Sequence, residues 1–104
     1  MADPIRIRAK RINDGVTEVV VLMPHPMETG LGLDPSGRGR DAHYISDVEV
    51  SLGDRAVLRA RLSIAVSKDP LISFRFRGGA AGDRVNVTWT DNLGDQGAGS
   101  ALIV

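Results

Sequence analysis

The sequence VNVTWT at residues 85–90 alternates strictly between apolar and polar side chains. A period of two predicts a β-strand with one face buried and the other facing solvent. We therefore expect Val85, Val87 and Trp89 to point inward, with Trp89 as the large plug of the core. The turn residues at 91–94 then close a hairpin.

The same period of two recurs along most of the chain, which predicts strands throughout. About seven short strands separated by turn signals favour an all-β, immunoglobulin-like β-sandwich, formed as a single domain over residues 1–104. The chain has no cysteine, so the disulfide of antibody domains is missing and the expected likeness is architectural. The further strands are predicted at residues 5–10, 16–23, 44–52, 55–62, 70–77 and 101–104.

The turn at residues 53–54 determines how two of these strands are registered. A strict two-residue turn would place their apolar faces on opposite sides of the sheet. A three-residue loop centred near Gly53 pairs Leu52 with Ala56 and aligns the faces, so we predict the longer loop. It also sets opposite charges across from each other, and these pairs are Glu49 with Arg59 and Asp47 with Arg61.

Residues 16–23 are unusual because both faces of the predicted strand are largely apolar. A half-buried strand normally has one polar face, so the second apolar face needs a cover. Either another layer of the domain or a partner protein provides it. One face carries Val19, Val21 and Met23, and the other carries Val16, Val20 and Leu22 beside Glu18.

The composition limits the functions that the chain can have. Thirteen basic and thirteen acidic residues give a formal net charge of zero, so no excess of positive charge favours a nucleic acid. The absence of cysteine excludes thiolate metal sites and cysteine nucleophiles. No apolar run approaches the ~20 residues of a membrane span. Residues 1–4 show neither the basic nor the apolar region of a signal peptide.

Residues 24–42 break the rhythm of the strands with a long stretch rich in proline and glycine. Long connections without regular structure are uncommon in compact domains and are often functional. Thioether and imidazole groups suit copper, and the candidate ligands are Met23, His25, Met27 and His43. With two histidines and no cysteine, a contact surface is the favoured interpretation, and no metal or cofactor is predicted.

The same stretch also contains residues that could take part in catalysis. His25 beside Glu28 is an arrangement typical of a general base. Thr29 is the only nearby nucleophile, and nothing identifies an oxyanion hole, so no catalytic residue and no enzyme activity are predicted.

Several stretches, read together, resemble the SoxZ family of the thiosulfate-oxidising Sox system. The most specific of them is HPMETG at residues 25–30, whereas GGxxGD at residues 78–83 is less so. The likeness spans nearly the whole chain in the right order. The matching stretches are residues 1–10, 21–30, 42–45, 65–70, 74–79, 82–83 and 87–92.

The resemblance implies a non-catalytic subunit of a heterodimer. In that family the SoxY subunit carries sulfur intermediates on a cysteine in a flexible arm, and SoxZ pairs with it. The resemblance also implies a periplasmic location reached by co-export with SoxY, and transient contact with Sox enzymes. The interface candidates are Val16, Val20, Leu22, Met23, His25, Met27, Glu28, Thr29 and His43.

Two other functions stay open at this point. One is an extracytoplasmic copper-binding module that uses the Met and His ligands named above. The other is an adhesion-type sandwich that associates with itself through exposed apolar surface. A homodimer of the isolated chain fits both this last function and the SoxZ-like one, so self-association does not separate them.

Overall fold

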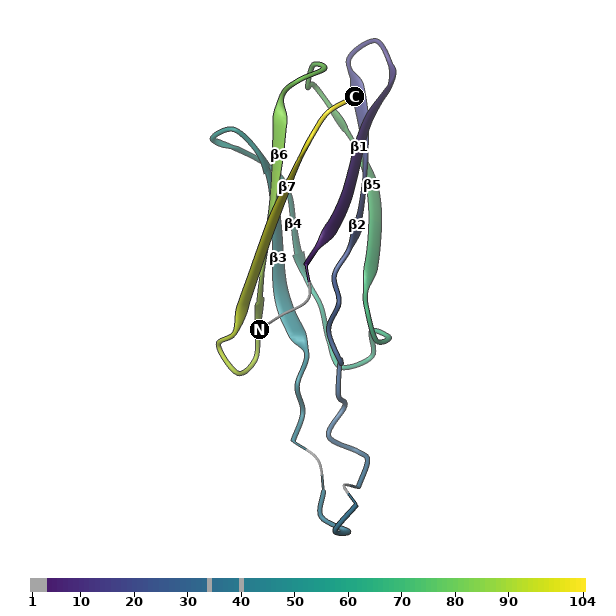
Figure 1. Cartoon of the computed structure of the whole chain (residues 1–104), viewed down its shortest axis with the longest axis vertical. Coiled ribbons are helices and arrows are strands. Elements are labelled where there is room, and N and C mark those ends of the chain that lie inside the picture. The colour runs from purple at the N-terminus through teal and green to yellow at the C-terminus, as the bar shows by residue number, and fades with distance from the viewer. Residues whose placement is uncertain (1–3, 34, 40) are drawn as a thin grey trace.

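The chain forms two antiparallel sheets packed face to face, as the computed structural model shows for residues 4–33, 35–39 and 41–104 (Figure 1). The all-β prediction is confirmed, since these residues form strands and connections without a helix. None of them, accordingly, forms a helix able to cross a membrane. The strands are β1 (Arg6–Asn13), β2 (Val16–Leu22), β3 (Ile45–Leu52), β4 (Arg55–Arg61), β5 (Leu71–Arg77), β6 (Arg84–Asp91) and β7 (Gln96–Leu102).

One sheet has the order β1-β2-β5 and the other the order β4-β3-β6-β7. The chain crosses between the sheets three times, after β2, after β4 and after β5, so strands that pair are often distant in sequence. This is the arrangement of an immunoglobulin-like sandwich. The C-terminus lies against β1, where Ala9 and Ile103 form a parallel bridge and the N–H of Val104 donates to the carbonyl of Ala9.

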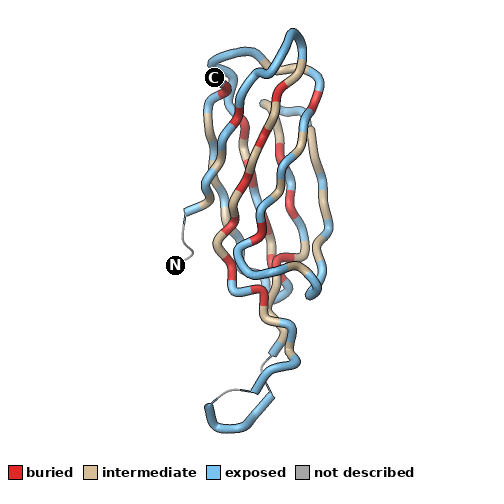
Figure 2. Tube along the Cα trace, turned by 90° about the vertical axis from the view of Figure 1, so that its right-hand side faces the viewer, coloured by how far each residue is buried: buried red, intermediate tan, exposed pale blue. Residues whose placement is uncertain are grey.

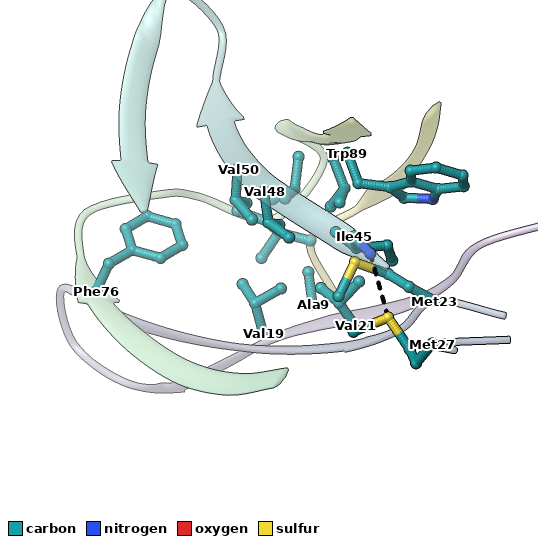
Figure 3. Close-up of a cluster of buried hydrophobic side chains, with 13 residues drawn as sticks. Ala9, Val19, Val21, Met23, Met27, Ile45, Val48, Val50, Phe76 and Trp89 are labelled. Atoms are coloured by element: carbon teal, nitrogen blue, oxygen red, sulfur yellow. Dashed lines mark hydrogen bonds between the residues drawn. The ribbon is translucent and has the colours of Figure 1, made fainter. Parts of the chain in front are cut away.

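The core lies between the sheets and contains the side chains predicted from the alternating stretch at residues 85–90. Val85, Val87 and Trp89 are all buried. They pack against the inward side chains of β2 and β3, and Figure 3 shows this cluster with Trp89 at one end and Phe76 at the other. The inward face of β2 is completely buried, and its residues are Thr17, Val19 and Val21.

The hairpin between β3 and β4 corrects one prediction and confirms another. Leu52 pairs with Arg55, so the turn has two residues and not three, with a positive φ of 57° at Gly53 that suits a tight hairpin turn. The register then shifts beside Val50, because Val57 is an extra residue in β4 and forms a bulge. The bulge restores the predicted charge pairs, Glu49 with Arg59 and Asp47 with Arg61.

The last strand is longer than predicted. A strand at residues 101–104 was expected, but β7 begins at Gln96 and pairs with β6 along its whole length. Glycine has a low strand propensity, so the sequence around Gly97 and Gly99 does not predict a strand. Their missing side chains leave room for Trp89 and for Ile5, respectively.

The described residues between positions 24 and 44 leave the sandwich between β2 and β3 and extend its long axis, and the molecule has extents of 55 × 22 × 18 Å (Figure 1). Glu28 and His43 form an antiparallel bridge near its base. Further out, Leu33 and Gly39 form a second bridge. The distal part is exposed, whereas the base joins the buried core (Figure 2).

Candidate functional site

Three polar side chains meet where the 24–44 segment leaves the sandwich. Nε2 of His25 lies 3.1 Å from Oδ2 of Asp91, and Nε2 of His43 lies 2.8 Å from the same oxygen. The imidazole rings contact each other edge to face, with centroids 4.6 Å apart. His25 also packs edge to face against Trp89 at 5.2 Å. The sequence separates these residues by up to 66 positions, and only the fold joins them.

Local backbone bonds hold His25 in place from both sides. Its N–H donates to Oδ1 of Asp69 and its carbonyl accepts from the N–H of Asp69, both at 3.0 Å. The N–H of Met27 donates to Nδ1 of His25 at 3.1 Å. Met27 and Asp69 have positive φ values of 49° and 53°, a strained conformation for such residues. The hydrogen bonds and packing around His25 hold these two residues in their strained conformations.

His43 is positioned by the turn that follows β6. The side chain of Asn92 accepts from the N–H of Tyr44 and donates to the carbonyl of Ala42, both at 2.8 Å. These two bonds lie on either side of His43 in the chain. The ring of His43 bonds through Nε2 to Oδ2 of the neighbouring Asp91. The turn therefore holds the returning end of the 24–44 segment against the sandwich.

Asp91 has enough hydrogen bonds to stay ionised although its side chain is buried. Its Oδ1 accepts the N–H groups of Leu93 and Asp95 at 3.0 and 2.9 Å, and its Oδ2 faces the two histidines. Burial alone raises the pKa of Asp91. The bonds from His25, His43, Asp95 and Leu93 outweigh burial and hold this pKa below its ordinary value of 3.8.

The proton positions in this cluster follow from its donors. Nδ1 of His25 accepts the N–H of Met27, so the ring proton of the neutral imidazole is on Nε2 and points to Asp91. Nε2 of His43 also faces this carboxylate, which can only accept. The cluster is thus a carboxylate that two imidazole N–H groups and two backbone N–H groups stabilise together.

One ligand atom from each of His25, His43 and Asp91 lies within 4.8 Å of the others, which is close enough for a shared metal ion. The hydrogen bonds do not fit that use. A metal on Nε2 of His25 would displace its proton while Nδ1 is still an acceptor, and this needs an imidazolate. Of the candidate copper ligands, Met27 already uses its sulfur to accept the N–H of Ile45 at 3.2 Å (Figure 3).

We expect copper(I) to bind without a stoichiometric end point. The measurement is a titration of the reduced metal against the wild-type chain and the His25→Ala variant, followed by calorimetry. Two titration curves that coincide would agree with the hydrogen-bond pattern. A one-to-one end point that His25→Ala removes would contradict it and restore the copper-binding alternative.

A cavity of about 570 Å³ opens beside the cluster at this end of the sandwich. His25, His43 and Asp91 line it, together with exposed charged residues from neighbouring loops. Asp95 lies 4.0 Å from Nε2 of His43. The other charged lining residues are Lys68 and Asp69.

The structure divides the predicted interface residues into two groups. The side chains of Met23, His25 and Met27 are at most 5% exposed, so the chain itself covers them. Their observed role is to anchor the 24–44 segment in the core. The more accessible candidates are Val16, Val20, Leu22, Glu28, Thr29 and His43.

Sequence reasoning paired His25 with Glu28 and missed Asp91. The carboxylate at His25 is that of Asp91, whereas Glu28 bonds to His43 through the backbone at 2.6 and 2.9 Å. The sequence pattern places Asp91 and Asn92 only in a turn. The available signal was that both have side chains able to bond across a turn while they directly follow a buried strand.

The outward face of β2 is the second candidate site. Val16, Val20 and Leu22 are half-buried there, in the centre of a three-stranded sheet. Leu71 of β5 pairs with Leu22 and is 64% exposed. No second layer of the described chain covers this face, which therefore presents an apolar strip to solvent.

Solved structures show the same fold at low sequence identity. The reduced superoxide reductase (neelaredoxin) from Archaeoglobus fulgidus superposes with a TM-score of 0.65 at 21% identity, over 100% of this chain and 92% of that one. The neelaredoxin from Ignicoccus hospitalis gives 0.64 at 16% identity, over 98% and 80%. These likenesses support the sandwich fold alone.

Sequence comparison gives a more specific result. No curated protein matches the chain. The model of one family, described as "Sulphur oxidation protein SoxZ", matches residues 5–101, which is nearly the whole chain. The chain therefore belongs to the SoxZ family of the sulfur-oxidising Sox system.

Proposed function

We propose that this chain is the non-catalytic subunit of a two-chain sulfur carrier, in which it pairs with a SoxY-like protein. The partner carries the sulfur intermediates on a cysteine during thiosulfate oxidation. Membership of the SoxZ family supports the pathway. The lack of cysteine supports the division of labour, because a chain without a thiol depends on another for covalent carriage through cysteine. A periplasmic location, with export alongside the partner, is part of the same proposal.

The observation that carries the pairing proposal is the uncovered apolar strip on the β1-β2-β5 sheet. Val20 and Leu22 lie at its centre, and Leu71 continues it onto β5. Interfaces concentrate their binding energy in such central apolar side chains, which become desolvated on association. The cluster of His25, His43 and Asp91 has a supporting role, because it holds the 24–44 segment beside the sandwich.

Val20→Asp is expected to weaken the heterodimer at least about 30-fold, because it places a carboxylate in the desolvated centre of the interface. The half-buried position of Val20 points away from the core, so the isolated fold should be retained. Native mass spectrometry of the mixture and calorimetric titration of the SoxY-like protein measure this effect.

Thr88→Asp is the matched control for that experiment. Thr88 is exposed on the outward face of the other sheet, where it pairs with Glu49 and Ala98. This variant is expected to bind like the wild type. Equal binding by both variants would place the interface elsewhere, and a wild-type chain that forms no complex would reject the pairing itself.

A further inference from the structure

We infer that the SoxY-like partner presents an acidic surface, which docks on the basic outward face of the β1-β2-β5 sheet. This rests on the proposed function and adds the chemistry of the partner. The name "basic face" is used below for the outward side chains of this sheet. They are Arg6, Arg8, Lys10, Asn13, Val16, Glu18, Val20, Leu22, Leu71, Ser73, Arg75 and Arg77.

Strand pairing shows that these side chains share one side of the sheet. Directly opposite residues of antiparallel strands point to the same face. Arg8, Val20 and Ser73 form one row across the three strands. The rows on either side of it are Arg6 with Leu22 and Leu71, and Lys10 with Glu18 and Arg75.

The basic face is far from neutral although the chain is neutral. It has five basic side chains and one acidic side chain, a net charge of four positive units, whereas the whole chain has thirteen of each sign. Arg75 neutralises Glu18 at 3.0 Å. Among the described residues, no carboxylate lies within the 4.0 Å of an ion pair from Arg6, Arg8 or Lys10. The apolar strip and the basic side chains that border it together complement an acidic protein surface with an apolar centre.

The opposite sheet provides a contrast within the same molecule. Two of its three outward arginines are ion-paired on their own face, with Arg59 3.2 Å from Glu49 and Arg61 3.7 Å from Asp47, and the third, Arg84, bonds to the hydroxyl of Ser100. Both pairs are exposed, and within each pair the two opposite charges cancel. That sheet consequently offers little electrostatic attraction to a partner, and it supplies the control residue for the experiment.

The charge of the basic face also disfavours a second copy of this chain as the occupant. A two-fold symmetric dimer through one face brings identical patches together. Here it would place cations against cations around the apolar strip, and like charges across an interface are destabilising. An anionic lipid surface would satisfy the charges, but the apolar side chains of β2 run between the basic residues of β1 and β5, and an apolar centre with a charged border suits a protein surface.

The decisive variants are Arg8→Glu on the basic face and Arg59→Glu on the opposite sheet, which make the same change of charge at exposed positions. The dissociation constant and association rate with the SoxY-like protein are measured at about 50 mM and about 500 mM NaCl, since salt screens such attraction. We expect Arg8→Glu to weaken binding at least about tenfold at low salt, mainly through the association rate, and less at high salt. Arg59→Glu should bind within about twofold of the wild type.

Each outcome decides between the two levels of the proposal. A complex that responds equally to both variants would reject the acidic partner and leave the pairing intact. A wild-type chain that forms no complex at either salt concentration would reject both. An Arg8→Glu effect on binding to anionic lipid vesicles, without one on the heterodimer, would assign the face to membranes. If Arg8→Glu fails to fold by circular dichroism, Arg6→Glu in the next row replaces it.

Discussion

The Asp91→Asn variant is expected to unfold with a free energy about 3 kcal/mol lower than that of the wild type at neutral pH. Asp91 accepts four hydrogen bonds in a buried position. Asparagine has a single acceptor oxygen, and its NH₂ group would face two of the four donors. Because Asp91 and Asn92 hold both ends of the 24–44 segment, we expect that segment to detach from the sandwich first. Denaturant unfolding, with hydrogen exchange at His25 and His43, measures both effects.

The contribution of Asp91 should depend on pH in one direction. Its pKa is lower in the folded chain than the ordinary value of 3.8, so the folded state favours the ionised form. The stabilisation is then fully present above the unfolded pKa and is lost as the pH falls through the folded pKa. The difference in stability between wild type and Asp91→Asn should consequently shrink as the pH falls below about 4.

Asp95→Asn is the control for both measurements. Its side chain is 73% exposed, and its carboxylate lies 4.0 Å from Nε2 of His43, at the outer limit of an ion pair. Its loss should therefore change stability by less than about 0.5 kcal/mol. An Asp91→Asn chain as stable as the Asp95→Asn chain would show that the buried carboxylate contributes nothing to holding this end of the sandwich.

Gly97→Ala is expected to lower the free energy of unfolding by about 3 kcal/mol. A Cβ atom at this position would lie 2.3 Å from Nε1 of Trp89 and 2.4 Å from its Cε2. The indole is rigid, buried and in contact with His25, so it cannot move without disturbing the polar cluster. Denaturant unfolding followed by tryptophan fluorescence reports the loss of stability and the displaced ring, since Trp89 is the only tryptophan.

Two other glycines calibrate that result. A Cβ atom at Gly39 would meet nothing within 4 Å, so Gly39→Ala should be nearly neutral. At Gly99, in the same strand as Gly97, the nearest atom is Cβ of Ile5 at 3.1 Å, and an intermediate loss is expected. If all three variants had equal stability, close packing of β7 under Trp89 would be ruled out.

Much of the sandwich was predictable because alternation reports which side of a strand is buried. Residues 85–90 predicted the inward set of β6, and residues 16–23 predicted a strand with an apolar outward face. The local pattern was less informative for β7, because glycines interrupt the alternation of side chains in that strand. It also misjudged the turn at Gly53, because a two-residue turn and a bulge at Val57 give the same charge pairs as a three-residue loop.

The sequence by itself determined the class of fold, the family and the unusual stretch at residues 23–30, because these depend on periodicity and on motifs that are local in the chain. Only the tertiary structure decided what that stretch does. Met23, His25 and Met27 proved to be buried anchors, since Asp91 and Asn92 from a distant turn bind the segment's two ends. The basic face likewise came from strand pairing, which aligns β5 with β2 across 49 or more residues of sequence and adds β1 through a hairpin. Contacts between distant segments set both sites, and no local pattern encodes such contacts.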